Sequence, residues 1–455
     1  MATVAEVTDL LSRRLDDAGP RLSRLDRYYE GTAPLALAAE RLRTAKLSGL
    51  AGLTTNWLRL ACDALSERLE VVGFRLAGST EASEDVWNTW EEAGGSDALA
   101  LALPEALLHG RSFLTVWGDE AGRPVVSAES AHQVAAFIDP AQRGARRVTA
   151  ALKRWADPDA KLARATLYLP EAVYRLASER PFTDGMSLET VRNWQTVEVV
   201  RNPLGVVPVV ELANRQRLMG SGESELTPGV LALQDLLGHL VSSLAVGAEA
   251  YALPRRWATG VEVPVDPETG AAIDPFGDAG PGRLYVVESE QAKLGQFPAA
   301  DLAALLAAID AATAHLLSQA AVPPHLALGA YKGQQVSAES VRAAEAGLVA
   351  KARRRQRTFA PPVEQAARLA LLVRDGRLPA GAERMECVWR DPRTEAEAAQ
   401  ADAALKKSQV GVPWAQLMAD LGYSPETVSL MRAQRRQEAL DGAGVDVRAL
   451  EALLP

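Results

Sequence analysis

Two long apolar segments stand near the centre of the chain: TPGVLALQDLLGHLVSSLAVGAEAYA at residues 227–252 and AADLAALLAAIDAATAHLLSQAA at residues 299–321. In both, apolar residues recur every three or four positions, the spacing of one face of an α-helix. Thr227 is a typical N-cap, and Pro228 suits the first helical position because its missing N–H costs nothing there. We therefore expect two helical rods, each roughly 35 Å long at about 1.5 Å per residue.

The first rod is expected to bury one apolar face. That face consists of Val230, Leu233, Leu237, Leu240, Leu244 and Ala248. Gln234, Asp235 and Ser242 fall off this stripe. The second rod carries many alanines, whose small side chains permit close approach between helices.

Between the rods lies an insertion rich in proline and glycine. Its turns fall within residues 264–282, and strand-like runs flank them at residues 257–265 and 283–289. After the second rod, a glycine-containing loop leads to Ser337, which is expected to cap a third helix at residues 338–374. The pair Pro361-Pro362 is expected to kink or break that helix.

The remaining chain contains short helices and strands. We expect helices at residues 4–28, split in two at Gly19-Pro20, and at 36–45, 56–69, 83–93 and 97–109. Strands are expected at residues 71–76, 112–117, 125–128, 134–138, 147–155, 163–169, 173–176, 191–200, 206–211 and 386–389, and helices at 394–408, 413–421 and from Ser424 onward. Consecutive strands separated by turns favour an antiparallel meander and an α+β fold.

Composition narrows the function. The chain has 455 residues, of which 48% are hydrophobic and 24% charged, so it can bury a large core. A net charge of −9 argues against a surface that grips nucleic acid through its phosphates. Cys62 and Cys387 lie far apart and indicate a reducing compartment. Charged residues inside the most apolar segments, such as Asp235 and Asp310, lead us to expect no membrane span.

Motifs for chemistry are missing from the sequence. It contains no phosphate-binding Gly-x-x-x-x-Gly-Lys-Ser/Thr loop. The five histidines, among them His109 and His132, are isolated in sequence, with no zinc-binding spacing, and a core or surface role is favoured for them. We therefore expect no catalytic residue, no metal site and no cofactor.

A run of positive charge marks the third helix: Lys351, Arg353, Arg354, Arg355 and Arg357. Such a run can contact phosphate. It can equally pair with acidic residues of neighbouring helices or subunits, and in an acidic chain ion pairing is favoured.

The order and spacing of several local strings resemble the portal proteins of tailed phages, of the group found in siphoviruses that infect actinobacteria. The strings are YYEG at residues 28–31, TNWL at 55–58, ERLEVVGF at 67–74, LALQD at 231–235, ALPRRW at 252–257, PPHL at 323–326, SAES at 337–340, VWRDP at 388–392 and LGYSPE at 421–426. The resemblance covers nearly the whole chain.

The resemblance implies a ring, usually of twelve subunits, at one vertex of the capsid, through which DNA enters during packaging and leaves during ejection. It implies a wing at residues 1–222, stem helices at 223–253 and 299–321, a clip at 254–298, a channel loop at 322–336, a long kinked helix with a wing strand at 337–390, and a helical crown at 391–455. In this arrangement Tyr331, Lys332, Gln334 and Gln335 face the DNA.

The implied partners are other copies of the chain, the large terminase that supplies the energy of translocation, a head-tail adaptor, and the major capsid or scaffolding protein. Double-stranded DNA passes without sequence-specific contact. The implied location is the virion, and the host cytoplasm during assembly.

Two other functions remain open from sequence. A head-tail adaptor or minor capsid protein would not need two rods around an insertion. A metal-dependent nuclease would need carboxylates that converge in a pocket.

Overall fold

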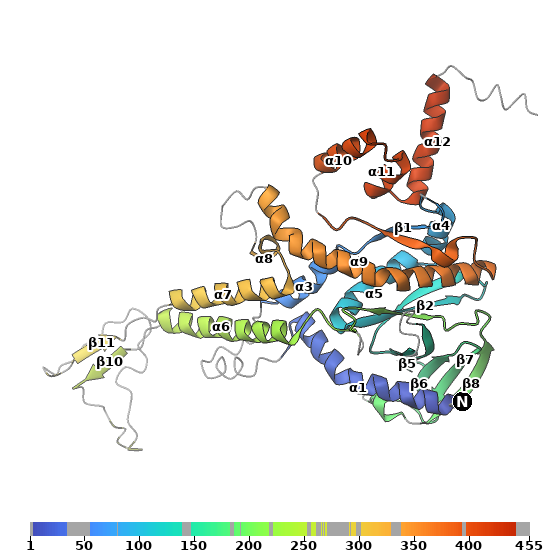
Figure 1. Ribbon diagram of the computed structural model, residues 1–455. Helices are drawn as coiled ribbons and strands as arrows, with labels where there is room; N and C mark the ends of the chain where they lie inside the picture. The colour runs from blue at the N-terminus through green and yellow to red at the C-terminus, as the bar shows by residue number, and fades with distance from the viewer. Residues whose placement is uncertain are drawn as a thin grey trace, which may run out of the picture. The chain divides into compact units, whose positions relative to one another are not determined.

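The computed structural model (Figure 1) combines helices and strands, as expected for an α+β protein. It describes residues 3–33, 55–79, 81–138, 147–182, 186–191, 193–217, 222–252, 256–260, 302–328, 338–393 and 397–442, and also 265, 267, 269, 270, 291 and 293–296. Contacts divide the chain into two units. Unit 1 comprises Met1–Glu30, Trp57–Pro228 and Leu317–Pro455, and unit 2 comprises Gly31–Asn56 and Gly229–Leu316.

Unit 1 contains a five-stranded sheet in the order β4-β5-β6-β7-β8, in which every neighbouring pair is antiparallel. Its strands are β4 (Val134–Ile138), β5 (Val148–Asp157), β6 (Leu162–Tyr168), β7 (Ala172–Ser178) and β8 (Trp194–Arg201). Sequence order and spatial order coincide. The predicted antiparallel meander is therefore confirmed for these five strands.

A second sheet of unit 1 has the order β3-β2-β9 and is also antiparallel. Its strands are β2 (Arg111–Gly118), β3 (Pro124–Glu129) and β9 (Val209–Ala213). Strand β9 begins three residues later than the sequence suggested, because Pro208 has no N–H to donate to the ladder. A separate pair joins β1 (Val71–Arg75) to β12 (Glu386–Trp389).

The main core of unit 1 lies where helices cover the β2 sheet. Helices α3 (Trp57–Ser66), α4 (Glu84–Glu92), α5 (Gly95–His109) and α9 (Ala338–Asp375) contribute to it. Helix α9 runs along β2, β3 and β9 (Figure 1). Trp90 is fully buried and meets Phe74 edge to face, with ring centroids 5.4 Å apart.

Helix α1 (Val4–Glu30) is continuous, so the predicted break at Gly19-Pro20 is wrong. Leu11 and Leu15 pack against the five-stranded sheet, and Leu22 packs against Phe113 beyond the proline. A proline inside a helix costs about 3 kcal/mol. Burial of the same helix face on both sides of Pro20 outweighs that cost.

Helix α9 likewise continues through Pro361-Pro362, so the prolines do not break it. Phe359 and Val363, which flank the pair, are both fully buried in the main core. Pro361 lies on the exposed side. Solvent can therefore satisfy the carbonyls that the prolines leave without a donor.

The C-terminal helices belong to unit 1. They are α10 (Glu397–Gln409), α11 (Trp414–Asp420) and α12 (Pro425–Gly442), close to the predicted ranges. Ser424 caps α12, since the N–H of Thr427 donates to its hydroxyl. Arg432 of α12 binds both carboxylate oxygens of Glu81, which lies just before α4, at 2.9 and 2.7 Å, and α12 contacts α4.

Unit 2 contains most of the two rods. They are α6 (Pro228–Ala252) and α7 (Ala303–Ala320). A two-stranded antiparallel sheet pairs β10 (Arg256–Thr259) with β11 (Lys293–Gln296). The predicted strand at residues 283–289 lies outside the described residues, and so does the predicted helix at 36–45.

The buried face of α6 differs from the predicted stripe. Gln234 is only 8% exposed and Ser242 only 6%, although both were expected off the buried face. The Gln234 amide donates to the carbonyl of Thr55 at 2.7 Å, and the Ser242 hydroxyl donates to the carbonyl of Gly238. Both side chains are buried because each finds a backbone acceptor.

By length and composition alone, Pro228–Ala248 of α6 and all of α7 are apolar enough to cross a membrane. Only 33% of this apolar stretch of α6 and 28% of that of α7 is buried within the subunit. A helix in the core of a protein, or at an interface between subunits, can be equally long and apolar. The two helices thus expose apolar surface that a single subunit does not cover.

Two glycine-to-alanine substitutions should change stability in opposite directions. A Cβ on Gly95, the first residue of α5, would lie 2.2 Å from the Trp90 ring, whereas a Cβ on Gly347 in α9 meets nothing within 4 Å. We expect Gly95→Ala to lower the free energy of unfolding by about 1–3 kcal/mol through overpacking. Gly347→Ala should raise it by about 0.5–1 kcal/mol. Urea unfolding followed by circular dichroism measures both changes in the free energy of unfolding. The same change in both variants would show that the contact between residue 95 and the Trp90 ring does not limit stability.

Candidate functional site

The exposed parts of the two rods form the first candidate surface. Leu236 of α6 is 45% exposed and Leu306 of α7 is 49% exposed. Where Gly247 faces the start of α7, a Cβ would lie 2.9 Å from Leu302 Cδ2, so the absence of a side chain lets the chain segments approach closely. Leucines exposed to this degree on long helices are typical of surfaces that pack against other subunits.

A buried charge cluster lies in unit 1, just before α6. The Glu225 carboxylate is 2% exposed and accepts from Arg355 Nε and Nη2 at 2.8 and 2.7 Å. Lys351 Nζ lies 2.9 Å from the other carboxylate oxygen and also donates to the carbonyl of Ala320 at 2.9 Å. Asn214 donates to the same carboxylate at 3.0 Å. Burial alone would raise the pKa of Glu225, but Lys351 and Arg355 outweigh it and hold the pKa below its usual range.

The backbone fixes Glu225 in this position. Its N–H donates to the carbonyl of Leu107 near the end of α5 at 2.9 Å. The segment that leads into α6 is thereby held by α5 through the backbone and by α9 through the side chain. Through its backbone and its side chain, Glu225 thus links its own segment to α5 and to α9, which are distant in sequence.

The five basic residues of α9 do not share one environment. Lys351 and Arg355 bind Glu225, and Arg353 lies 3.4 Å from Asp391. Arg354 and Arg357 are exposed. The helix thus directs part of the run inward, to the acidic partner in the core, and part outward to solvent.

The expected DNA-facing loop cannot be placed. Tyr331, Lys332, Gln334 and Gln335 lie outside the described residues. The described residues on either side belong to helices α8 (Pro324–Leu328) and α9.

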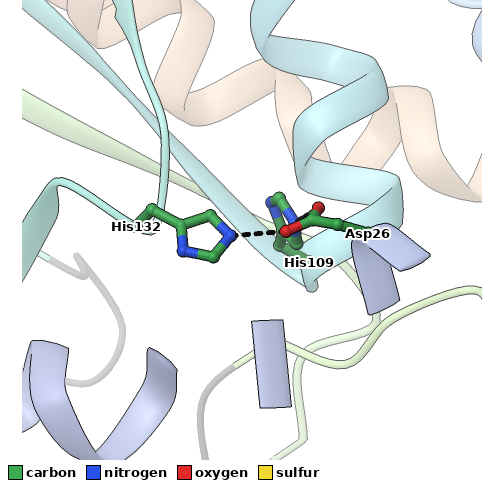
Figure 2. Close-up of side chains that lie close together, drawn as sticks. All are labelled: Asp26, His109 and His132. Atoms are coloured by element: carbon green, nitrogen blue, oxygen red, sulfur yellow. Dashed lines mark hydrogen bonds and ion pairs between the residues drawn. The ribbon is translucent and has the colours of Figure 1, made fainter. Parts of the chain in front are cut away.

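A histidine cluster is the feature that sequence reasoning missed (Figure 2). Asp26 of α1 lies between two rings: Oδ1 is 2.6 Å from His109 Nε2, and Oδ2 is 2.7 Å from His132 Nε2. The other nitrogen of His109, Nδ1, lies 2.9 Å from Glu105 Oε2. These residues are separated by up to 106 positions, so no local motif could reveal them.

The cluster controls the charge of His109. Burial alone would lower the pKa of His109, but Glu105 and Asp26 on its two nitrogens outweigh burial and raise it. Burial would likewise raise the pKa of Glu105, yet His109 and Ser130 lower it below its usual range. The imidazolium form therefore has an acceptor for each of its two N–H groups.

A family model and two curated relatives all match this chain to phage portal proteins, over most of its length. The family model described as Phage portal protein, SPP1 Gp6-like, matches residues 11–418. The portal protein of Mycobacterium phage L5 is 32% identical over 405 residues, which is 85% of this chain and 79% of the relative. The portal protein of Mycobacterium phage D29 is 33% identical over 463 aligned positions, covering 98% of this chain and 91% of the relative.

Two solved structures are more distant. A chain from the virion of a native gene transfer agent particle has a TM-score of 0.42 and 13% identity, covering 82% of this chain and 89% of that one. A chain from the neck of the native particle, computed with C12 symmetry, has a TM-score of 0.41 and 12% identity, covering 85% and 94%.

The buried carboxylate should be far more important for stability than an exposed one. We expect Glu225→Gln to lower the free energy of unfolding by about 3–5 kcal/mol, because it leaves Lys351 and Arg355 as buried charges without a counter-charge. Glu198→Gln is the matched control. Glu198 lies 2.8 Å from Arg175 in an exposed pair, so its loss should cost about 0.2–1 kcal/mol. Urea unfolding compares the two, and a similar cost for both would contradict the role of Glu225.

Proposed function

Because the chain belongs to the SPP1 Gp6-like family of phage portal proteins, we propose that its copies form a ring of about twelve subunits around a channel for the phage genome. The family expected from the sequence is thereby confirmed. The single observation that carries the proposal is the family match over residues 11–418. The protein is a structural component of the virion, and its place is the capsid vertex.

The apolar rods support assembly into a ring. Leu236 and Leu306 lie on helices of which about two thirds is not buried within the subunit. Packing of each subunit against two neighbours would remove this surface from water, at about 25 cal/mol per Å² of apolar area. In a closed ring every subunit makes the same two contacts, one with each neighbour, so no subunit leaves this apolar surface uncovered.

The parts of the ring follow the family arrangement. We assign residues 1–222 to the wing, 223–253 and 299–321 to the stem, 254–298 to the clip, 322–336 to the channel loop, 337–390 to the long helix with its wing strand, and 391–455 to the crown. Strands β10 and β11 lie at the two ends of the clip segment and pair with each other. Its antiparallel pairing brings those ends together, as an insertion that projects from two rods requires.

We assign the clip to the contact with the large terminase and then with the head-tail adaptor. The major capsid or scaffolding protein is the partner proposed for the rest of the ring, and no cofactor is needed. No specific observation favours a head-tail adaptor or a minor capsid protein. A nuclease would require converging carboxylates, and among the described residues the candidate metal group contains only one, Asp26, beside two histidines.

The DNA contact is proposed to be weak and without sequence specificity. Lys332 is the cation of the loop Tyr331, Lys332, Gln334 and Gln335. Repeated around a ring, one such contact per subunit attracts phosphate without arresting movement. Arg354 and Arg357, both exposed on α9, are further candidates for DNA contact.

Ring formation can be tested through the stem. Mass photometry of the purified protein should show a closed assembly of about twelve subunits. Leu306→Glu should raise the concentration needed for assembly at least about tenfold, because a carboxylate must be desolvated at the subunit contact. Val410, which is 81% exposed between α10 and α11, provides the control Val410→Glu, and it should leave assembly unchanged. A wild-type protein that stays monomeric would refute the ring.

The DNA contact can be tested separately. Lys332→Glu should leave rings intact but impair genome packaging or retention, because repeated negative charges would meet phosphate at close range. Arg384→Glu reverses an exposed charge elsewhere and should package normally. The readout is DNA protected from nuclease in complementation of a portal-deficient phage. Normal packaging by Lys332→Glu rings would exclude the loop as the DNA contact.

A further inference from the structure

We propose that Asp26, His109 and His132 form a zinc site that ties helix α1 to the rest of unit 1. Their ligand atoms, one from each side chain, all lie within 4.8 Å of one another. Two imidazoles and one carboxylate form a donor set that suits Zn²⁺. Mg²⁺ and Ca²⁺ prefer sites built from oxygen alone, so they are not expected to bind here.

The geometry is close to that of a metal site. In a tetrahedral site with bonds of about 2.0–2.1 Å, ligand atoms lie about 3.3 Å apart. The Asp26 oxygens now lie 2.6 and 2.7 Å from the two Nε2 atoms, the distances of hydrogen bonds. Binding requires the protons between these atoms to leave and one Asp26 oxygen to move to a position that faces both Nε2 atoms. Figure 2 shows the Asp26 carboxylate placed between the two rings.

His109 is oriented by contacts beyond the ligands. Glu105 Oε2 lies 2.9 Å from His109 Nδ1, and the Ser130 hydroxyl donates to the same oxygen at 2.9 Å. Once Nε2 gives up the proton that lies between it and Asp26, the carboxylate on the far nitrogen keeps the remaining proton on Nδ1, so the Nε2 lone pair can face the metal position. The His109 side chain is 1% exposed, which restricts its rotation.

The backbone next to His109 is also fixed. Gly110 has a φ of 88°, and a Cβ there would lie 2.7 Å from the carbonyl oxygen of Gly222. Arg21 of α1 donates to the carbonyl of His109 at 3.1 Å. The buried ligand is thus set in place before a metal arrives.

The other two ligands leave room for a fourth. The side chains of Asp26 and His132 are 30% and 33% exposed, so both can rotate slightly and water can reach the metal position. Zinc would then have three protein ligands and one water. The ligands come from the last turn of α1, the last residue of α5 and the turn between β3 and β4. One ion would therefore hold together three elements of the wing.

Zinc content is the direct test. The assembled protein, treated with chelator and then dialysed against limiting Zn²⁺, should retain about one zinc per subunit by elemental analysis. His132→Gln and Asp26→Asn should each weaken zinc binding at least about tenfold in a competition titration. His325→Gln is the matched control. His325 lies 3.4 Å from Glu345, elsewhere in unit 1, and its replacement should leave zinc binding unchanged.

A second measurement separates a metal site from a network of ion pairs. Glu105→Gln removes no ligand, yet it should weaken zinc binding about 10–100-fold, because His109 loses its orienting carboxylate. X-ray absorption should show a shell of nitrogen and oxygen only. Zinc should raise the thermal midpoint of wild type but not of His132→Gln. Equal zinc content in wild type and His132→Gln, or none in wild type, would overturn the proposal, and neither result would bear on ring formation.

Discussion

The buried carboxylate of Glu225 is the interaction on which the arrangement of unit 1 depends. Desolvating a carboxylate is costly, and the cost is recovered only because two cations and an amide contact it directly. These partners come from α9 and from the end of β9, while the Glu225 backbone is bound to α5. The segment at residues 222–228 therefore cannot shift within unit 1 without separating charges in a medium that scarcely screens them.

This cluster also explains how an acidic chain can carry a dense basic run without a strongly basic surface. Lys351 and Arg355 are neutralised inside the subunit, and Arg353 lies near Asp391. Arg354 and Arg357 remain exposed on α9. A channel for DNA benefits from this arrangement, because strong attraction to phosphate would hold the genome rather than let it pass.

Sequence periodicity predicted most of the secondary structure, because a buried face recurs at fixed spacing wherever a helix or strand covers a core. It failed where tertiary packing overrode local preference: α1 and α9 run through their prolines since Leu22 and Phe359 are buried beyond or beside them. It also failed on α6, where Gln234 is buried through a hydrogen bond to a residue far away in sequence. The cluster of Asp26 and His132 was missed for the same reason, since only the fold brings these residues together.

The pairing of β1 with β12 has a consequence for synthesis of the chain. Val71 pairs with Trp389, so the partner of the first strand is made more than 300 residues after it. At about 5–20 residues per second, β1 waits roughly 15–60 seconds after leaving the ribosome before its partner follows. During that interval its backbone edge is open to any other extended chain, including a neighbouring nascent copy. Burial of β1 in the β1–β12 pair is therefore one of the last steps in the folding of unit 1.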